Sequence, residues 1–402
     1  MKRLTLFPVL LVCAAALVCS LDFGLLLSQE IEAETENKHL LYTPAFTPWI
    51  SWNGGKNLSF YVSNKFFLEY HNYSDNEDAS GWAKPPFISE LTYSAVKYRI
   101  NESMSLEAGR IDYADPLEFA ATGLFDGARF AMDLPQGTIS AGVFYTGFLY
   151  RETALILMTP NDGENYAKEW GMGNLGAYFA SRRFLTAVRW DMPLGQVNTL
   201  SAEVLLQVDL NGNEQSLHSQ YAEVKVELSP LSTMGVTAGA LFELMEDEQG
   251  KSYGAFGFLA GMKMELPGTL NDWLSVNFKL TSGSLNDDSI AFTPISCVSQ
   301  GDVFPGTLSG LAYPSADYSV RLHNTLFAQG SLRYFIRTDS DSNTDTDGNL
   351  YGGEMWISLA WQPLEDIRLT VGAGVFFPSL GNWYPKDTDP MGKLNAVLTL
   401  SF

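Results

Sequence analysis

The last ten residues of the chain alternate between apolar and polar side chains, with Val397 as the one exception. Successive side chains of a β-strand point to opposite faces, so this spacing predicts a strand with one apolar and one polar face. The apolar positions are Leu394, Ala396, Leu398, Leu400 and Phe402, and the polar positions are Lys393, Asn395, Thr399 and Ser401. A strand of this kind has an apolar environment on one side only.

The same alternation recurs along most of the chain. In each segment the apolar face carries no charged side chain, whereas the polar face mixes charges, hydroxyls and glycine. The pattern predicts an all-β protein built from many antiparallel strands, and a secreted soluble sandwich or β-helix is the alternative. The clearest segments are 139–149, 200–210, 221–228, 236–244, 274–281, 332–336, 355–361 and 367–375.

The charge and composition of the chain exclude some classes of function. The chain has 402 residues, with 46 acidic and 25 basic side chains and a net charge of −21. Charged residues make up 18% of the sequence, which is below the roughly 25% usual for soluble domains. A chain this acidic lacks the basic surface that phosphate binding requires, so nucleic acid is not an expected partner.

The first residues predict export. Met1-Lys2-Arg3 precedes an apolar stretch from Leu4 to Val18, which is shorter than the roughly 20 residues needed to cross a bilayer. We expect residues 1–20 to be a signal peptide; lipidation of Cys19 is the alternative. Removal of this segment leaves Cys297 as the only cysteine, so an internal disulfide is not expected.

Beyond the signal, no apolar run approaches the length of a transmembrane helix, so only a β-barrel could span a membrane. Short connections alternate with long polar ones, as in barrels with short turns at one rim and long loops at the other. We predict a transmembrane antiparallel up-and-down β-barrel over residues 57–402, with about sixteen strands and with fourteen or eighteen possible. The count requires a hairpin within 317–337. Residues 21–56 are expected to form a periplasmic lead-in, as a helix, a small plug or an extra edge strand.

The strand that ends at Phe402 resembles the C-terminal strand by which bacterial outer-membrane β-barrels are recognised for assembly. The resemblance implies the outer membrane of a diderm bacterium, with extracellular loops and both termini periplasmic. It also implies outer-membrane lipid and the barrel assembly machinery as partners, with Phe402 as the assembly signal. The composition leaves a homotrimer and a monomer both open.

A second resemblance covers about twenty residues, from Gly109-Arg110-Ile111-Asp112-Tyr113-Ala114-Asp115-Pro116 to Gly123-Leu124-Phe125-Asp126-Gly127-Ala128-Arg129. This stretch looks like a strand, loop and strand of substrate-export and anion-type porin families. Arg110 and Arg129 would face a solute, and the neighbouring aspartates would hold their guanidinium groups. The alternative is a salt-bridged hairpin rim.

A barrel of about sixteen strands encloses water, so the polar faces would form the wall of a pore for passive diffusion of small hydrophilic solutes. Each wall residue could instead belong to a salt bridge that only fills space. Two long loops, 151–173 and 283–318, could fold inward and narrow the pore. The predicted pore-lining residues are Arg110, Asp112, Asp126, Arg129, Glu203, Glu223, Lys225, Glu227, Lys279, Arg333, Arg337 and Arg368.

Metal binding and catalysis have less support in the sequence. Asn343, Asp345, Asp347 and Glu354 match the spacing of a calcium loop, although an acidic loop without metal is the alternative, and no other cofactor is expected. The four histidines, His39, His71, His218 and His323, are scattered, and no nucleophile elbow occurs, so we do not expect an enzyme. The competing function is a surface-exposed barrel that binds ligands or host molecules through its long loops.

Overall fold

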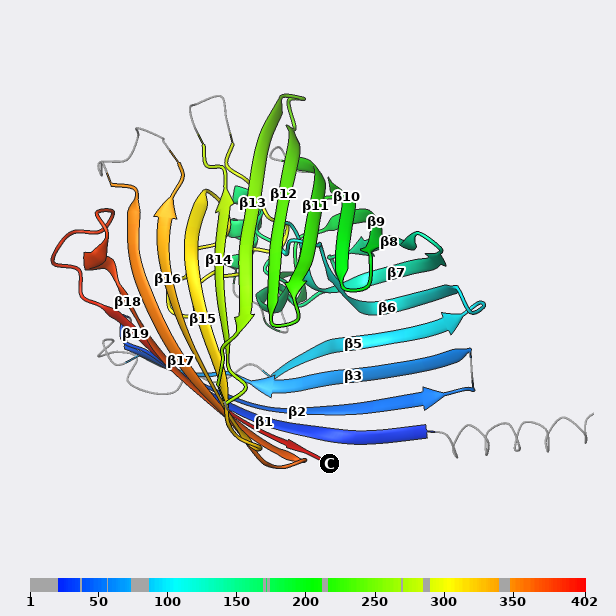
Figure 1. Ribbon diagram of the computed structural model, residues 1–402, viewed down its shortest axis with the longest axis horizontal. Coiled ribbons are helices and arrows are strands. Elements are labelled where there is room, and N and C mark those ends of the chain that lie inside the picture. Colours follow the sequence, from blue (N-terminus) through cyan, green and yellow to red (C-terminus); the bar gives the residue numbers. More distant parts are fainter. Residues whose placement is uncertain are drawn as a thin grey trace, which may run out of the picture.

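The computed structural model describes residues 21–402 except 37, 56, 74–86, 169–170, 172–173, 212–215, 269, 285–289 and 340–347. These residues form one antiparallel sheet that closes on itself, with two short α-helices and two 3₁₀ segments (Figure 1). The predicted signal peptide, residues 1–20, lies outside the described residues. None of the helices among the described residues has the length and apolar character needed to cross a membrane.

The strands follow one another around the sheet in chain order. They are β1 (Leu21–Glu34), β2 (His39–Asn53), β3 (Leu58–Leu68), β4 (Tyr70–Tyr73), β5 (Phe87–Arg99), β6 (Met104–Ala114), β7 (Thr122–Leu134), β8 (Gly137–Tyr145), β9 (Arg183–Leu194), β10 (Asn198–Asp209), β11 (Leu217–Leu231), β12 (Met234–Asp247), β13 (Ser252–Glu265), β14 (Trp273–Thr281), β15 (Leu311–His323), β16 (Leu326–Arg337), β17 (Leu350–Leu364), β18 (Ile367–Phe377) and β19 (Met391–Ser401). Helices α2 (Arg151–Ala154) and α3 (Pro160–Tyr166) lie between β8 and β9, where η1 (Leu175–Tyr178) follows them, and η2 (Pro378–Leu380) follows β18.

Pairing between the first and last strands closes the barrel. Strand β1 pairs with β19 from Leu26↔Ser401 to Glu34↔Lys393, and its other edge pairs with β2. Strands β3 and β4 both pair with β2 and are separated only by Glu69, so the nineteen strand segments of the described chain form eighteen barrel strands. Among the described residues, closure pairs the first strand with the last, so the sheet has no free terminal strand.

The estimate of about sixteen strands was therefore too low. The two additional strands are β1 and β2, which occupy the segment 21–56 that was expected to be a periplasmic lead-in. Pro44 and Pro48 hide the alternation of β2, and the run Leu25-Leu26-Leu27 hides that of β1. The hairpin required within 317–337 is confirmed by β15 and β16.

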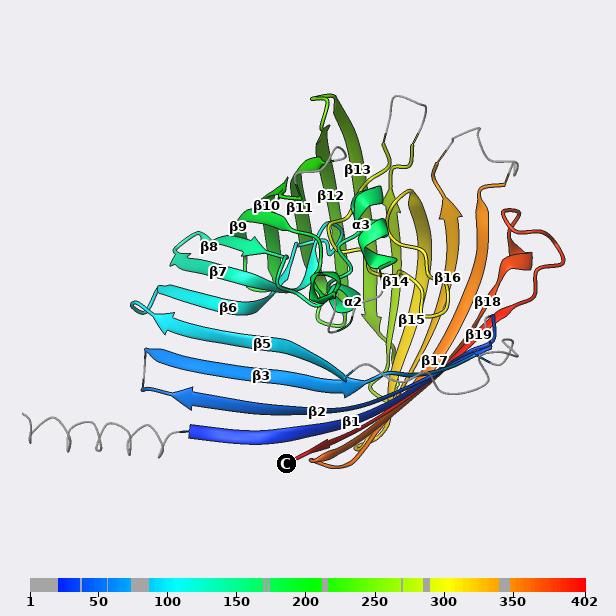
Figure 2. The same ribbon diagram turned by 180° about the vertical axis from the view of Figure 1, so that it is seen from behind.

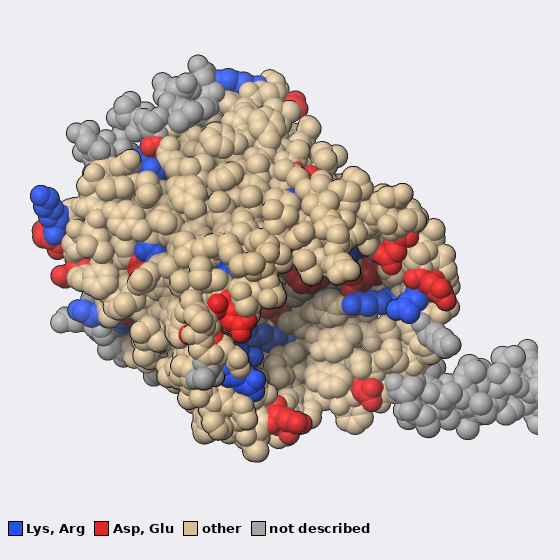
Figure 3. Space-filling model, viewed as in Figure 1, with Lys and Arg blue, Asp and Glu red and all other residues tan. Residues whose placement is uncertain are grey.

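The two faces of the sheet differ as the alternation predicted. Apolar side chains at alternate positions point outward; Phe242, Leu332 and Ile357, for example, are 54%, 57% and 53% exposed. Figure 3 shows that most of the wall seen from this side carries no Lys, Arg, Asp or Glu. An outward apolar band is what contact with lipid acyl chains requires.

The hydrophobic core lies inside the barrel because three connections fold inward. These are residues 115–121 between β6 and β7 and the described parts of 146–182 between β8 and β9 and of 282–310 between β14 and β15. Phe119, Ile156 and Phe292, one from each connection, are at most 2% exposed. Figure 2 shows α2 and α3 within the ring of strands. Inward folding of the two long loops is confirmed, whereas the third connection was not anticipated.

Candidate functional site

Nine of the twelve predicted wall residues lie at inward-facing positions of their strands. They share the face of their strand with fully buried neighbours, such as Leu205 on β10, Tyr221 on β11 and Phe335 on β16. Their role in a pore remains a prediction. The nine are Arg129, Glu203, Glu223, Lys225, Glu227, Lys279, Arg333, Arg337 and Arg368.

The other three, Arg110, Asp112 and Asp126, lie on the opposite face of the β6–β7 hairpin. On β6 the inward positions are those of Glu107 and Tyr113, and Arg110 and Asp112 alternate with them. Asp126 is likewise an odd number of residues from the inward Arg129. The short motif suggested that its arginines and aspartates all face inward. Asp126 lies three residues before the inward Arg129, however, and a period of two places residues three apart on opposite faces. The prediction that these three line the lumen was wrong.

Arg110 instead closes a gap in the wall. The β5–β6 ladder ends at Ser94↔Arg110, directly after Gly109, whose φ of +133° suits glycine. A Cβ on Gly109 would lie 2.1 Å from the Ser94 carbonyl oxygen. Beyond this point Arg110 donates through Nη1 to the Leu91 carbonyl at 2.6 Å and through Nη2 to the Phe148 carbonyl at 2.9 Å. The side chain thus satisfies carbonyl groups where the ladder stops.

Asp126 holds Arg110 in this position, as the motif suggested. The Asp126 carboxylate accepts from Nε and Nη2 of Arg110 at 2.9 and 2.7 Å, a bidentate pair that fixes the plane of the guanidinium group. Asp115 does not share in this contact. Its carboxylate accepts four backbone N–H groups of its own loop, from Leu117, Phe119, Ala120 and Ala121, at 2.7–3.1 Å.

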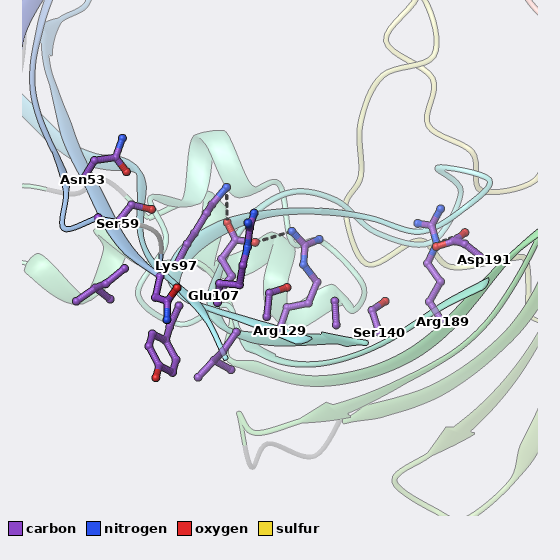
Figure 4. Close-up of a pocket in the computed structure, with 16 residues that line it drawn as sticks. Asn53, Ser59, Lys97, Glu107, Arg129, Ser140, Arg189 and Asp191 are labelled. Atoms are coloured by element: carbon purple, nitrogen blue, oxygen red, sulfur yellow. Dashed lines mark hydrogen bonds and ion pairs between the residues drawn. The ribbon is translucent and has the colours of Figure 1, made fainter. Parts of the chain in front are cut away.

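Inside the barrel, a hollow of about 570 Å³ opens beside the β2–β3 turn. Glu107 stands in it between two cations, 3.1 Å from Lys97 Nζ and 2.6 Å from Arg129 Nη2 (Figure 4). Arg189 and Asp191 form a second pair at 2.9 Å on the same wall. The side chains of Lys97 and Arg129 are 59% and 37% exposed, so these charges remain accessible to water and to a solute. Glu107 and Lys97 were not among the residues predicted from the sequence to line a pore.

A second hollow, of about 540 Å³, lies between β14 and β18 near the same end of the barrel. Its polar side chains include Arg321, Gln329, Gln362 and the predicted wall residue Arg368, and the described residues that line it include no carboxylate. The two hollows therefore differ in charge: the first holds both signs, and the second is basic.

Several inward carboxylates hold the inward connections rather than face water. The Glu354 carboxylate accepts the backbone N–H groups of Asp302, Val303 and Phe304 at 2.9, 3.0 and 2.7 Å. Backbone N–H groups of these connections also donate to Glu243 and Glu223, from Thr293 at 2.9 Å and Leu117 at 3.3 Å. Tyr113, next to the 115–121 connection, donates its hydroxyl to Glu203. These contacts fix the connections at the wall.

An ion triad anchors the connection between β8 and β9. Arg183, at the start of β9, is fully buried and contacts Asp162 of α3 at 2.5 Å and also Asp209 of β10. A buried guanidinium requires such partners because an isolated charge is expensive away from water. Helix α3 is thereby tied to the barrel wall.

Most of the other predicted basic wall residues also have partners. Lys225 lies 2.7 Å from Glu227, and Arg337 lies 3.2 Å from Asp339. Lys279 is packed over the ring of Phe119 at 5.4 Å, a cation–π contact with the 115–121 connection. The salt-bridge interpretation thus holds for Lys225 and Arg337.

The predicted calcium loop gains no support from its last ligand. Glu354 is already engaged by Arg333 at 2.8 Å and by three backbone N–H groups. Asn343, Asp345 and Asp347 lie outside the described residues. Within the described part of the chain, no group of three or more His, Cys, Asp or Glu is arranged to hold a metal ion.

Comparison with solved structures shows that the chain shares its β-barrel fold with known proteins. No model of a known protein family matches the sequence, and neither does any curated protein. Among solved structures, the chain is similar to Pseudomonas aeruginosa OprD, with 14% identity, a TM-score of 0.58 and 95% of each chain covered. It is also similar to OpdK of that organism, solved with vanillate, with 10% identity, a TM-score of 0.61 and coverage of 95% of this chain and 98% of that chain. OprD and OpdK are outer membrane proteins, and the described chain has their closed β-barrel fold.

Proposed function

We propose that this protein is a passive pore of the outer membrane of a diderm bacterium, through which small hydrophilic solutes diffuse. The observation that carries the proposal is the pair of water-accessible hollows, lined by charged and amide side chains, inside a closed barrel with an apolar outer face. The shared fold with outer membrane proteins supports the same conclusion.

The barrel supplies the physical requirements of such a pore. A closed ring of strands pairs its backbone groups within the wall, so no polar edge meets lipid. The three inward connections, residues 115–121 and the described parts of 146–182 and 282–310, reduce the width of the lumen. A solute would then pass between the accessible charges of Lys97, Glu107 and Arg129, which impose a transverse field.

We infer the orientation of the barrel from the lengths of its loops. At one end of the barrel, each turn has no more than seven residues. These turns join β2 to β3, β5 to β6, β7 to β8, β9 to β10, β11 to β12, β13 to β14, β15 to β16 and β17 to β18, whereas the long connections lie at the other end. We assign the short-turn end and both termini to the periplasm, and the long loops to the exterior. Phe402 directly follows β19; its N–H donates to the Leu25 carbonyl at 2.9 Å, and its side chain is 72% exposed. It is therefore accessible to the barrel assembly machinery. Outer-membrane lipid would contact the apolar face, which could also serve a homotrimer.

The alternative is a sealed barrel that binds ligands through its long loops. It is favoured by the buried apolar side chains that the inward connections place inside the ring, such as Phe119, Ile156 and Phe292.

Recordings from purified protein in planar bilayers separate the two functions. A pore gives discrete conductance steps that disappear when the protein is denatured before insertion. A correctly folded barrel that inserts and gives no steps would support the binding function and rule out the pore.

A further inference from the structure

Two of the four histidines, which the sequence separates, meet in the barrel. His39 lies at the start of β2 and His71 lies in β4. The register pairs His39 with Tyr73 and Leu41 with His71, so the two histidines are diagonal neighbours on one face of the sheet. Nε2 of His39 lies 3.1 Å from Nδ1 of His71. The expectation that the histidines are scattered is wrong for this pair.

Stacking holds the two imidazole rings in a common orientation. The rings are parallel within 7°, with centroids 5.2 Å apart. Tyr73 stacks on His39 with centroids 4.5 Å apart and an interplanar angle of 12°. The aromatic ring limits rotation of His39, so its nitrogen remains directed toward His71 without further ordering cost.

The surroundings of the pair are acidic. Glu69 Oε2 lies 3.7 Å from Nε2 of His71, the ring nitrogen that does not face His39. A carboxylate at this position favours the tautomer with the proton on Nε2, so the Nδ1 lone pair faces Nε2 of His39. Glu34 lies opposite His39 in the β1–β2 register. Both carboxylates would add attraction for a bound cation.

We propose that His39 and His71 chelate a divalent transition-metal ion, of the kind represented by Cu²⁺, Ni²⁺ and Zn²⁺, through His39 Nε2 and His71 Nδ1. Neutral imidazole is a preferred ligand of these ions. Metal–nitrogen bonds of about 2.0–2.1 Å to nitrogens 3.1 Å apart enclose an angle of roughly 100° at the metal, which suits adjacent positions of a square-planar or tetrahedral centre. Water completes the coordination, since the described residues provide no set of three ligands.

The site would lie at the long-loop mouth of the lumen. His39 shares its face of β2 with Thr43 and Ala45, which are buried inside the barrel, and it directly follows the β1–β2 connection. A bound ion would place two positive charges beside Glu34 and Glu69 at the entrance. This inference concerns binding and does not depend on whether the barrel conducts.

Titration of the purified full chain with Cu²⁺, followed by electron paramagnetic resonance, tests the proposal. We expect one tightly bound Cu²⁺ whose spectrum shows two equatorial nitrogens. His39→Ala and His71→Ala should each weaken binding at least tenfold and remove one nitrogen from the spectrum, and Glu69→Gln should weaken it about 10–100-fold as a loss of ligand orientation.

The other two histidines supply the matched controls. His218→Ala and His323→Ala should bind Cu²⁺ as the parent chain does. His39→Phe keeps a ring against Tyr73 and therefore separates loss of a ligand from loss of packing if His39→Ala does not fold. Unchanged Cu²⁺ affinity in folded His39→Phe and His71→Ala, or a spectrum with a single nitrogen in the parent chain, would overturn the proposal.

Discussion

Arg333 Nη1 lies 2.8 Å from Glu354 Oε1, and this pair joins an inward connection to the wall of the barrel. Arg333 also contacts Asp302 of that connection, while Glu354 accepts the N–H groups of Asp302, Val303 and Phe304. The Glu354 side chain is 1% exposed, so the contacts form away from water and restrict the movement of the 282–310 connection.

Replacement of Glu354 by alanine should release this connection. The substitution leaves Arg333 with one carboxylate partner fewer and three N–H groups without their acceptor, which we expect to lower the free energy of unfolding by about 3–5 kcal/mol. If the connection narrows the pore, single-channel conductance should rise. Denaturant titration and bilayer recordings measure the two effects. Glu365→Ala, at an exposed position of the β17–β18 turn, should change neither. Parent-like conductance in folded Glu354→Ala would show that this connection does not limit flow.

Arg183 should stabilise the barrel mainly because it neutralises the buried carboxylates of Asp162 and Asp209. Arg183→Met leaves Asp162 and Asp209 buried without a counter-charge, and we expect a loss of about 3–5 kcal/mol in the free energy of unfolding. The triple variant Arg183→Met/Asp162→Asn/Asp209→Asn removes all three charges and should recover part of that loss. Denaturant titration of both variants checks the coupling. Equal stability of the single and triple variants would contradict it.

Glu107 should influence ion selectivity because it neutralises two accessible cations. Glu107→Gln leaves Lys97 and Arg129 without their shared carboxylate, so the pore should shift toward anions. The reversal potential in a KCl gradient measures the shift. Asp126→Asn removes the same charge from the opposite face of the β6–β7 hairpin and should leave the reversal potential unchanged. Equal shifts in both variants would contradict the assignment of the two faces.

Cys297 should be unreactive in the folded protein. Burial raises the pKa of its thiol to about 11, and the thiol donates to the Leu157 carbonyl at 3.3 Å. The raised pKa favours the protonated thiol, so the contribution of this thiol to stability is complete below its unfolded pKa of about 9 and is lost as the pH rises through 11. Iodoacetamide at pH 8 should modify Cys297 only after denaturation, as measured by peptide mass spectrometry. Equal labelling rates in folded and denatured protein would refute this.

The sequence alone determined which side of each strand faces outward from the barrel. The period of two is a local property of the chain, so Leu332 and Ile357 could be assigned to the outside and Arg333 and Arg368 to the inside without knowledge of the fold. The prediction for Arg110 and Asp126 departed from this reasoning, because a short motif was given more weight than the alternation. The error was therefore one of interpretation, since the residue numbers already excluded a common face with Arg129.

Only the tertiary structure decided the number of strands, the interior and the pairing of distant residues. Strands β1 and β2 became recognisable through the closure of β1 against β19, which joins the two ends of the chain. The inward path of residues 115–121 depends on Glu223 and on Ile295, which donates its N–H to the Ala120 carbonyl at 2.6 Å. His39 and His71 meet because β4 continues β3 beside β2. Each of these features rests on contacts between residues far apart in the sequence, and a local pattern of side chains contains no information about such contacts.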